Sequence, residues 1–433
     1  MTDVQDTQRT LDLALRIGEV LMSNGAGAAD VTATMSSVCH HLGIRNALVD
    51  VTFTTLTLSH QPSVDDAAVT MRRHVTHREI DYADLTQVDL LVYELLAGGV
   101  DRDEAAAEIA RISSTGRPYP RWLTTLSWGV TGAGVALLLG GDWVVLLVAA
   151  AAACGIEVLQ RQLEKRRLPL FYSQVAGALL ATMMAVGIAA TPVPLNPSLV
   201  VSATIIMLLA GLGFVGSIQD ALTGFYITAN ARVMEVMIAT IGVIVGVSMG
   251  LGLGAMLGVD IQLDPGSAGL SRLPAVIAGA AICASGFAIA VYSPPRVILP
   301  VGAIAGSATG LSFVLTQNGM DRAPAAGVAA VGIGFVSYAI ARAIRVPPLI
   351  VIVSCIVPML PGLSIYRSLS LLADENITGV LPMITAGGVA IALSAGVLLG
   401  EYAAQPLGRE ARRLERRLSG PRLVGPLRAR SRR

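Results

Sequence analysis

Long apolar runs, separated by short polar or basic loops, occupy the chain from about residue 123 to residue 402. A helix that crosses a bilayer needs about 20 mainly apolar residues. The runs that come near this length are 123–140, 143–159, 173–191, 198–217, 233–257, 274–292, 297–316, 324–341, 348–365 and 380–402. The pattern therefore predicts a mainly α, polytopic membrane protein with ten transmembrane helices.

The first 120 residues have a shorter and more polar pattern. Apolar positions recur at helical spacing in some segments, and β-branched residues alternate in others. Asp101, followed by Glu104 three residues later, has the spacing of a capping box. We expect helices at 10–22, 30–42, 84–96 and 101–112, and strands at Val49–Ser59 and Ala68–Thr76. Residues 1–120 are therefore predicted to form a small α+β cytoplasmic domain.

Composition and charge agree with this division. The chain is 53% hydrophobic and 14% charged, whereas soluble domains carry about 25% charged residues. Residues 1–122 have a net charge of −7, residues 123–402 of 0 and residues 403–433 of +8. This distribution argues against nucleic acid as a partner. The four cysteines stand alone, without a CxxC pair, which argues against a disulfide-stabilised secreted domain.

The tail, residues 403–433, is rich in arginine. Within 407–418 leucine and alanine fall on one helical stripe with arginines around it, which predicts an interfacial helix that binds anionic membrane lipids. Beyond Ser419 we expect disorder.

Basic residues in the short loops predict the orientation in the membrane. One side would carry Arg161, Lys165, Arg166, Arg167, Arg232, Arg296, Arg342 and Arg345, and the other Arg272, Arg322 and Arg367. The richer side is expected to face the cytoplasm, and both termini lie on it. We therefore expect a multi-pass protein of the cell membrane with both termini cytoplasmic.

The ten runs divide into two sets of five with a matching internal spacing. Pro197 begins the fourth run and Gly211 follows 14 residues later; Pro348 begins the ninth run and Gly362 follows at the same spacing. An odd number of spans per half places the halves in opposite orientations, as in the inverted repeats of secondary transporters. We expect membrane repeats at 121–259 and 260–402, although proline and glycine are common enough here for chance to be the alternative.

Glycine and proline inside the fourth and ninth runs are candidates for a binding site. They interrupt helical hydrogen bonding, and the freed backbone groups can bind a zwitterion, amides facing its carboxylate and carbonyls its ammonium. The alternative is that these small or rigid residues only kink helices or pack them together. The candidate substrate-binding residues of the two runs are Gly211, Gly213, Pro358, Pro361 and Gly362.

Polar residues cluster between the fourth and fifth runs. Asp220 follows the fourth run, and Asn230, Arg232 and Glu235 follow at the start of the fifth. Asn230 and Arg232 are further substrate-binding candidates. Glu235 lies one turn inside an apolar run, where charge is costly and usually functional, so it is the first candidate for proton coupling and Asp220 the second. The alternative is that Arg232 and Glu235, three residues apart, form a structural ion pair. Two other acidic residues lie where they can reach the cytoplasmic interface: Glu157 and Glu401.

Other polar groups in the first domain are weaker candidates. His74 and His77 could present metal ligands, but a spacing of three on a strand places them on opposite faces. We therefore favour surface histidines and expect no metal or cofactor. Threonines of the expected strand could supply hydroxyls to a small ligand. Because threonine is also a good strand former, we favour a purely structural role for Thr52, Thr54, Thr55 and Thr57.

Three segments resemble the threonine/serine exporter family, whose members join a cytoplasmic domain to ten membrane spans. They are LRIGEVLMSNGAGAADVTATMSSVCHHLGI, GLGFVGSIQDALTGFYITANARVMEVM and PMLPGLSIYRSL. The chain has Ala210-Gly211 where the family tends to have Pro-Gly, which predicts a gentler first break. The resemblance, which covers about residues 10–402, implies export of small amino acids driven by the proton gradient. Split-chain relatives are associated with dicarboxylate export.

The leading hypothesis is therefore proton-coupled export of threonine and serine by alternating access around the broken helices. Export of dicarboxylates such as succinate is the first alternative, for which Arg232 is the obvious cationic candidate. A passive channel, or a membrane-anchored hydrolase, is a further alternative. The hydrolase reading lacks a GxSxG motif or a metal-binding constellation. The oligomeric state is left open, a homo-oligomer included.

Overall fold

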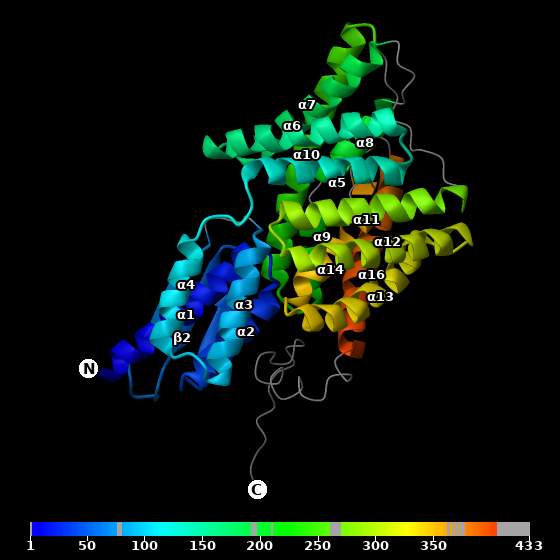
Figure 1. The fold of residues 1–433 in the computed structure, drawn as a ribbon. Coiled ribbons are helices and arrows are strands. Elements are labelled where there is room, and N and C mark those ends of the chain that lie inside the picture. The colour runs from blue at the N-terminus through cyan, green and yellow to red at the C-terminus, as the bar shows by residue number, and fades with distance from the viewer. Residues whose placement is uncertain are drawn as a thin grey trace. The chain divides into compact units, whose positions relative to one another are not determined.

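The computed structural model describes residues 2–75, 80–191, 197–208, 211–259, 270–361, 364–365, 368, 371 and 377–404 (Figure 1). The described chain divides into two compact units. The N-terminal unit contains residues up to Pro118 together with Gly216–Arg232. The membrane unit contains Tyr119–Val215 and Val233–Ala404. The segment Gly216–Arg232, which we expected to belong to the membrane repeat, therefore clusters with the N-terminal domain.

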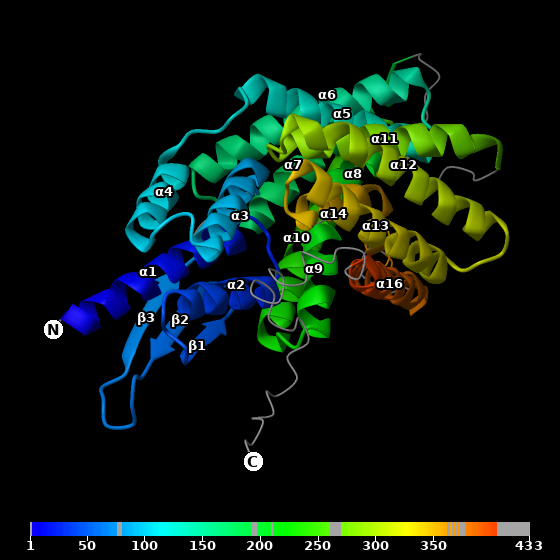
Figure 2. The same cartoon turned by 60° about the horizontal axis from the view of Figure 1, so that its bottom comes forward.

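The N-terminal unit is an α+β domain, as predicted. Its elements are α1 (Thr2–Ser23), α2 (Ala28–His41), β1 (Ala47–Val51), β2 (Thr55–His60), β3 (Val69–His74), α3 (Tyr82–Ala97) and α4 (Arg102–Ser114). The strands form an antiparallel sheet in the order β1-β2-β3, with α1 and α2 packed on it (Figure 2). Helices α3 and α4 pack against each other and against α1. The capping box at the start of α4 is confirmed, because the Asp101 carboxylate accepts from the Glu104 amide and the Glu104 carboxylate accepts from the Asp101 amide.

The single strand expected at Val49–Ser59 is wrong, because this segment is a hairpin. Strand β1 ends at Val51, and β2 begins at Thr55 and pairs back on it, with Val51 opposite Leu56. The turn is closed at Thr52, whose amide and hydroxyl both donate to the Thr55 carbonyl at 2.9 and 3.2 Å. Since the turn contains neither glycine nor proline, its composition gave no sign of a break.

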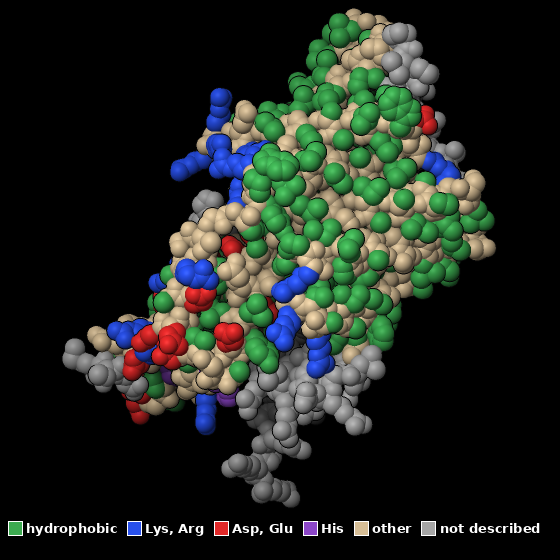
Figure 3. Space-filling model, viewed as in Figure 1, with side chains coloured by type: hydrophobic (Ala, Val, Ile, Leu, Met, Phe, Trp, Pro, Cys, Tyr) green, Lys and Arg blue, Asp and Glu red, His purple; other side chains and the backbone are tan. Residues whose placement is uncertain are grey.

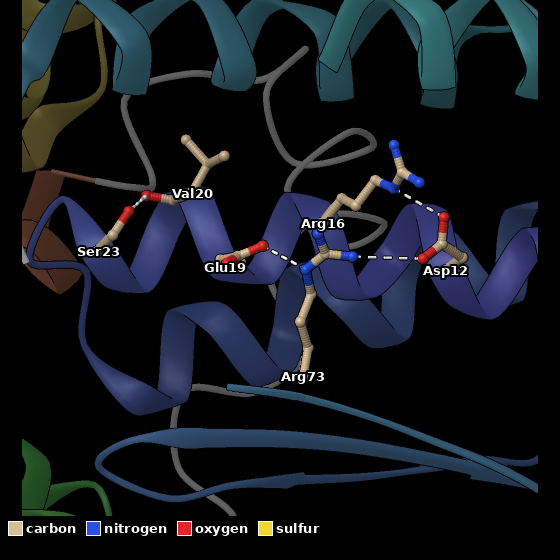
Figure 4. Close-up of polar contacts among 6 residues, drawn as sticks. All are labelled: Asp12, Arg16, Glu19, Val20, Ser23 and Arg73. Carbon is tan, nitrogen blue, oxygen red and sulfur yellow. Dashed lines mark hydrogen bonds and ion pairs between the residues drawn. The ribbon is translucent and has the colours of Figure 1, made fainter. Parts of the chain in front are cut away.

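One face of the sheet packs on α1 through both apolar and charged contacts. Leu56 and Leu58 are fully buried there. Arg73 of β3 reaches α1, where it pairs with Asp12 at 3.3 Å and with Glu19, and Arg16 pairs with Asp12 at 2.7 Å (Figure 4). These groups are about one-third exposed, so each pair contributes at most about 1 kcal/mol and mainly orients α1 on the sheet.

Of the two candidate metal-binding histidines, His74 lies within the described residues. His74 Nδ1 lies 2.6 Å from the Thr54 carbonyl and 3.2 Å from the Thr55 hydroxyl. His77 lies outside the described residues. Within the described ranges there is no group of three residues that could hold a metal ion.

Among the described residues, eight helices are long and apolar enough to cross a membrane; the fourth and ninth of the ten expected spans lie partly outside the described residues. They are α5 (Arg121–Leu139), α6 (Trp143–Lys165), α7 (Leu170–Ala189), α10 (Tyr226–Met256), α11 (Leu273–Ala290), α12 (Pro295–Gln317), α13 (Arg322–Ile344) and α16 (Val380–Ala404). Single-turn 3₁₀ helices at Leu270–Arg272 and Ile377–Gly379 precede α11 and α16. On the face shown in Figure 3, hydrophobic side chains cover these long helices, while most Asp and Glu side chains gather over the N-terminal unit. An apolar exterior of this kind matches contact with lipid.

The fourth expected span falls on α8 (Pro197–Leu208) and α9 (Gly211–Leu222), and Leu209 and Ala210, between them, lie outside the described residues. The ninth begins with α14 (Pro348–Ile356) and a 3₁₀ turn, Val357–Met359, and it stops being helical at Leu360, which has extended backbone angles.

The order of packing in the first set of membrane helices recurs in the second. The first helix packs on the second, the second on the third, and all three on the short helix that follows: α5, α6, α7 and α8 in one set, α11, α12, α13 and α14 in the other. The first helices of the two sets pack against each other. A Cβ on Gly134 of α5 would clash with Cys283 of α11, and one on Gly279 would lie 2.6 Å from the Leu138 amide nitrogen. At successive contacts the residue number increases along α5 and decreases along α11, so these two helices are antiparallel.

Each set also ends with a helix that carries small residues every four positions. In α10 these are Gly242, Gly246, Gly250 and Gly254, which pack on α7; in α16 they are Gly388, Ala392, Gly396 and Gly400, which pack on α13. In both pairs the contacts advance in the same direction along the two helices, so the pairs are parallel. Close backbone approach at small residues is typical of helix packing in membranes.

Candidate functional site

The fourth and ninth expected spans contact each other. A Cβ on Gly211, the first described residue of α9, would lie only 3.0 Å from Cβ of Leu360. Leu360 directly follows the 3₁₀ turn and has extended backbone angles, φ −60° and ψ 138°. Gly211 therefore meets the place where the ninth run stops being helical. We call this contact the junction of the fourth and ninth runs, and glycine at position 211 permits the close approach.

The prolines of the ninth run lie where the helix ends, as expected from their chemistry. Pro358 is within the 3₁₀ turn and Pro361 follows Leu360. Neither has an N–H, so the Ser354 carbonyl loses the donor that an α-helix would offer from residue 358. The Val357 carbonyl instead accepts from the Leu360 amide at 3.3 Å. Of the other glycines proposed for the site, Gly213 is in the first turn of α9 and Gly362 lies outside the described residues.

A buried serine joins α16 to α9 close to this junction. The hydroxyl of Ser394 donates to the Val215 carbonyl at 3.1 Å, one helical turn after Gly211, and Ser394 is 3% exposed. Neither Ser394 nor Leu360 was among the site residues predicted from the sequence. A usable signal was present, because Ser394 lies two residues before Gly396, as Ser248 lies before Gly250.

A second polar cluster lies at the turn between α9 and α10, inside the N-terminal unit. Arg232 Nε lies 3.1 Å from Asp220 Oδ2, and the side chains are 13% and 1% exposed. The turn includes Gly224 with φ of 93°, a backbone conformation that favours glycine. It brings the start of α10 back along α9, where Arg232 lies over Gly216. A Cβ there would approach its Nη1 to 2.6 Å.

The ion pair of Arg232 that the structure describes is with Asp220, and the alternative pair with Glu235 stays a prediction. Arg232 turns toward α9 and pairs with Asp220, which the hairpin brings near, although Glu235 is closer in sequence. Glu235 and Asn230 have exposed side chains on α10. The structure thus brings together two of the four polar candidates from this region.

The same cluster includes backbone groups at the start of α2. Asp220 Oδ1 accepts a hydrogen bond from the Ala28 amide at 3.0 Å, and Arg232 Nη2 donates to the Ala26 carbonyl at 3.4 Å. The carboxylate is thus neutralised by an arginine and by the N-terminal end of a helix, where an anion is favoured. Removing one partner of such a buried pair typically costs about 3–5 kcal/mol.

The two other acidic residues differ from each other. Glu157 lies 3.6 Å from Arg161 on α6 and is 23% exposed. Glu401 is buried, with 7% of its surface exposed, so the expectation that it extends toward the interface is wrong. It lies on the face of α16 that packs closely on α13.

Comparisons with known proteins assign the family. The ThrE threonine/serine exporter model matches residues 12–254, and the second model, "Threonine/Serine exporter, ThrE", matches residues 276–403. A Mycobacterium tuberculosis protein named "probable threonine/serine exporter" is 36% identical over 426 residues, covering 96% of this chain and 80% of the relative. A Corynebacterium glutamicum threonine/serine exporter is 32% identical over 423 residues, covering 95% and 86%. No solved structure matches the chain.

These matches run through both units and through both sets of membrane helices. They name transport proteins, which removes the membrane-anchored hydrolase from consideration. The resemblance seen in the three sequence segments is confirmed over nearly the whole chain. This multi-pass membrane protein belongs to the threonine/serine exporter family.

Proposed function

We propose that this protein exports threonine and serine across the bacterial cell membrane, driven by the proton gradient. The names of its relatives support the direction of transport and the substrates. The observation that carries the mechanism is the contact between Gly211 of the fourth run and Leu360, where the ninth run stops being helical. Helix interruptions at such a junction are where secondary transporters bind substrate.

The substrate site would use main-chain groups at this junction. The amides at the start of α9 would face the carboxylate of an amino acid, and carbonyl groups at the end of α14 would face its ammonium. Gly211, Gly213, Pro358, Pro361 and Gly362 shape this site in the proposal. Asn230 and Arg232 would contact substrate on its way from the cytoplasm.

The chemistry of Arg232 favours a zwitterion over a dicarboxylate. A dianion such as succinate would need a cationic partner, and Arg232 is already paired with the buried Asp220. Succinate would have to break this pair to use the arginine. An amino acid carries its own positive charge and does not need it.

We infer that the membrane helices form ten passes in a 5+5 inverted repeat, two of the passes being broken. The recurring order of packing, the antiparallel contact of α5 with α11, and the matching small-residue helices α10 and α16 support this proposal. Rocking of one half against the other would open the junction to each side in turn. The basic residues in the loops support cytoplasmic termini.

Glu235 is the first candidate for the coupling proton and Asp220 the second. Labelled threonine, serine and succinate would be loaded into vesicles containing the protein, and efflux measured with and without an imposed pH difference. We expect the imposed pH difference to drive threonine and serine out of the vesicles against their own concentration gradients. Succinate should not move in this way. Glu235→Gln should abolish movement against the gradient but retain threonine exchange at equal pH. Uphill movement in this variant would contradict the assignment, and pH-independent downhill flux alone would indicate a passive channel.

A further inference from the structure

Helix α2 takes part of its N-terminal cap from a residue far away in the sequence. Its N-cap residue is Gly27, which has no side chain and so cannot accept a hydrogen bond from the first turn of the helix. The Ala28 amide donates instead to Asp220, 192 residues later. An N-cap residue normally supplies this acceptor from its own side chain.

We propose that Asp220 is the positioning residue by which the N-terminal domain holds the α9–α10 hairpin, and that transport depends on this hold. The carboxylate bonds to α2 through one oxygen and pairs with Arg232 of α10 through the other. Arg232 in turn donates to the Ala26 carbonyl, just before α2. These three contacts connect the start of α2 to both helices of the hairpin.

Helix α9 connects Asp220 to the contact between Gly211 and Leu360. Asp220 lies nine residues after Gly211 on this one helix, a distance of about 14 Å along its axis. A change in how the domain holds Asp220 would therefore shift or loosen the residue that contacts Leu360. The transport part of the inference rests on the proposed function; the structural part does not.

A merely local role, in which Asp220 only stabilises α2, is the competing explanation, and Gly27 allows the two to be separated. Its backbone angles, φ −66° and ψ 151°, suit any residue, and a Cβ would lie 3.6 Å from Asp220 Oδ1, an ordinary contact. Serine at position 27 would cap the amides of residues 29 or 30, whereas Asp220 takes that of Ala28. Gly27→Ser can thus restore a cap to α2 without restoring the hold on the hairpin.

The experiment uses the full-length protein in lipid nanodiscs and in vesicles. Hydrogen exchange would be followed in peptides from α2 and from residues 216–232, and threonine efflux measured in parallel. In Asp220→Ala we expect exchange to rise about tenfold or more in both segments, as loss of a buried charged contact implies, and efflux to fall. In Gly27→Ser/Asp220→Ala we expect α2 to recover, while the hairpin stays unprotected and efflux stays low.

Two further variants serve as controls. Gly27→Ser alone should leave exchange and efflux as in the unmodified protein. Asp50→Ala removes an exposed carboxylate from the same domain and should also change neither.

Recovery of the hairpin and of efflux in the double variant would overturn the proposal in favour of the local role. Unchanged hairpin exchange in Asp220→Ala would overturn it as well. If the hairpin loosens but threonine is not transported even by the unmodified protein, the proposed function fails while the structural hold stands.

Discussion

Burial of individual side chains changes their chemistry at several points of the N-terminal unit. Cys39 is fully buried in α2, and this burial raises the pKa of its thiol to about 12. Asp220 is buried to a similar degree, but it remains compatible with charge because Arg232 and the Ala28 amide face it. A buried ionisable group is therefore neutral or paired, and the two cases have different consequences.

Native Cys39 should resist alkylation at pH 8–9. Because the thiolate is the reactive form, a pKa of about 12 leaves almost none of it in the folded protein, whereas an unfolded thiol begins to ionise near pH 9. The raised pKa also means that this residue favours folding below about pH 9, and that its contribution is lost as the pH rises toward 12. Treatment with iodoacetamide followed by peptide mass mapping measures this. Equal modification of Cys39 in folded and denatured protein would contradict it.

Ser394→Ala should destabilise the membrane unit by about 1 kcal/mol, the usual size of a buried hydrogen bond between helices. The loss is expected because the hydroxyl donates to the Val215 carbonyl across two helices. Ser248→Ala is the matched control, since Ser248 has the same position relative to the glycine stripe of α10 but is exposed. Thermal unfolding in detergent would compare the two variants. An equal effect would show that the contact with α9 is not what matters.

At the scale of elements, glycine stripes set how closely helices approach. Gly246 of α10 leaves no room for a Cβ against the Val175 carbonyl of α7, and Gly400 of α16 leaves none against Val331 of α13. Because the obstacle is backbone in each case, rotation of a side chain cannot relieve it. The end of the helix at Leu360 is a second feature at this scale, since it frees main-chain polar groups that a continuous helix would pair.

Gly246→Ala and Gly400→Ala should each destabilise the protein by about 1–3 kcal/mol, the usual range for overpacking. Each added methyl group would force two helices apart. The controls are Gly252→Ala and Gly387→Ala in the same two helices, where a Cβ meets nothing within 4 Å. These should be neutral or slightly stabilising, since alanine favours helix. Unfolding temperatures measure the difference, and similar values in all four variants would refute the packing argument.

The sequence predicted helices better than it predicted turns. Amphipathic or uniformly apolar periods identify α1, α2, α3 and α4, and the eight long membrane helices, because helical hydrogen bonds are local. The hairpin at Thr52 was missed because it lacks the usual turn residues. In the ninth run, where a break was predicted from its prolines, the α-helix does end just before Pro358, and Leu360 is extended.

For the whole molecule, the distribution of charge divides an acidic domain from an apolar body. The structure changes this division at one segment, since Gly216–Arg232 clusters with the N-terminal unit. The same chain segment thus belongs by sequence to the membrane repeat and by contacts to the other unit. Any movement of the domain that is transmitted to the hairpin would act through α9 and α10.

The proposed orientation predicts different accessibility for two exposed loop positions. In a variant without native cysteines, Asp142→Cys should react with a membrane-impermeant maleimide on intact cells, because it lies between the first two spans. Arg166→Cys, after the second span, should react only once the membrane is opened. Both positions are exposed, so a difference would report sidedness and not burial. The opposite result would place the termini outside the cytoplasm.

By itself the sequence determined the class of protein, most of the described helices and the family. These depend on composition and on spacing between near neighbours, which the chain carries wherever it folds. Only the tertiary structure decided that Arg232 pairs with Asp220, that Asp220 caps α2, and that Gly211 meets Leu360. Each of these contacts joins elements whose approach depends on the path of the whole chain between them. No local pattern encodes that path, so the partners of the polar residues could not be read from their positions.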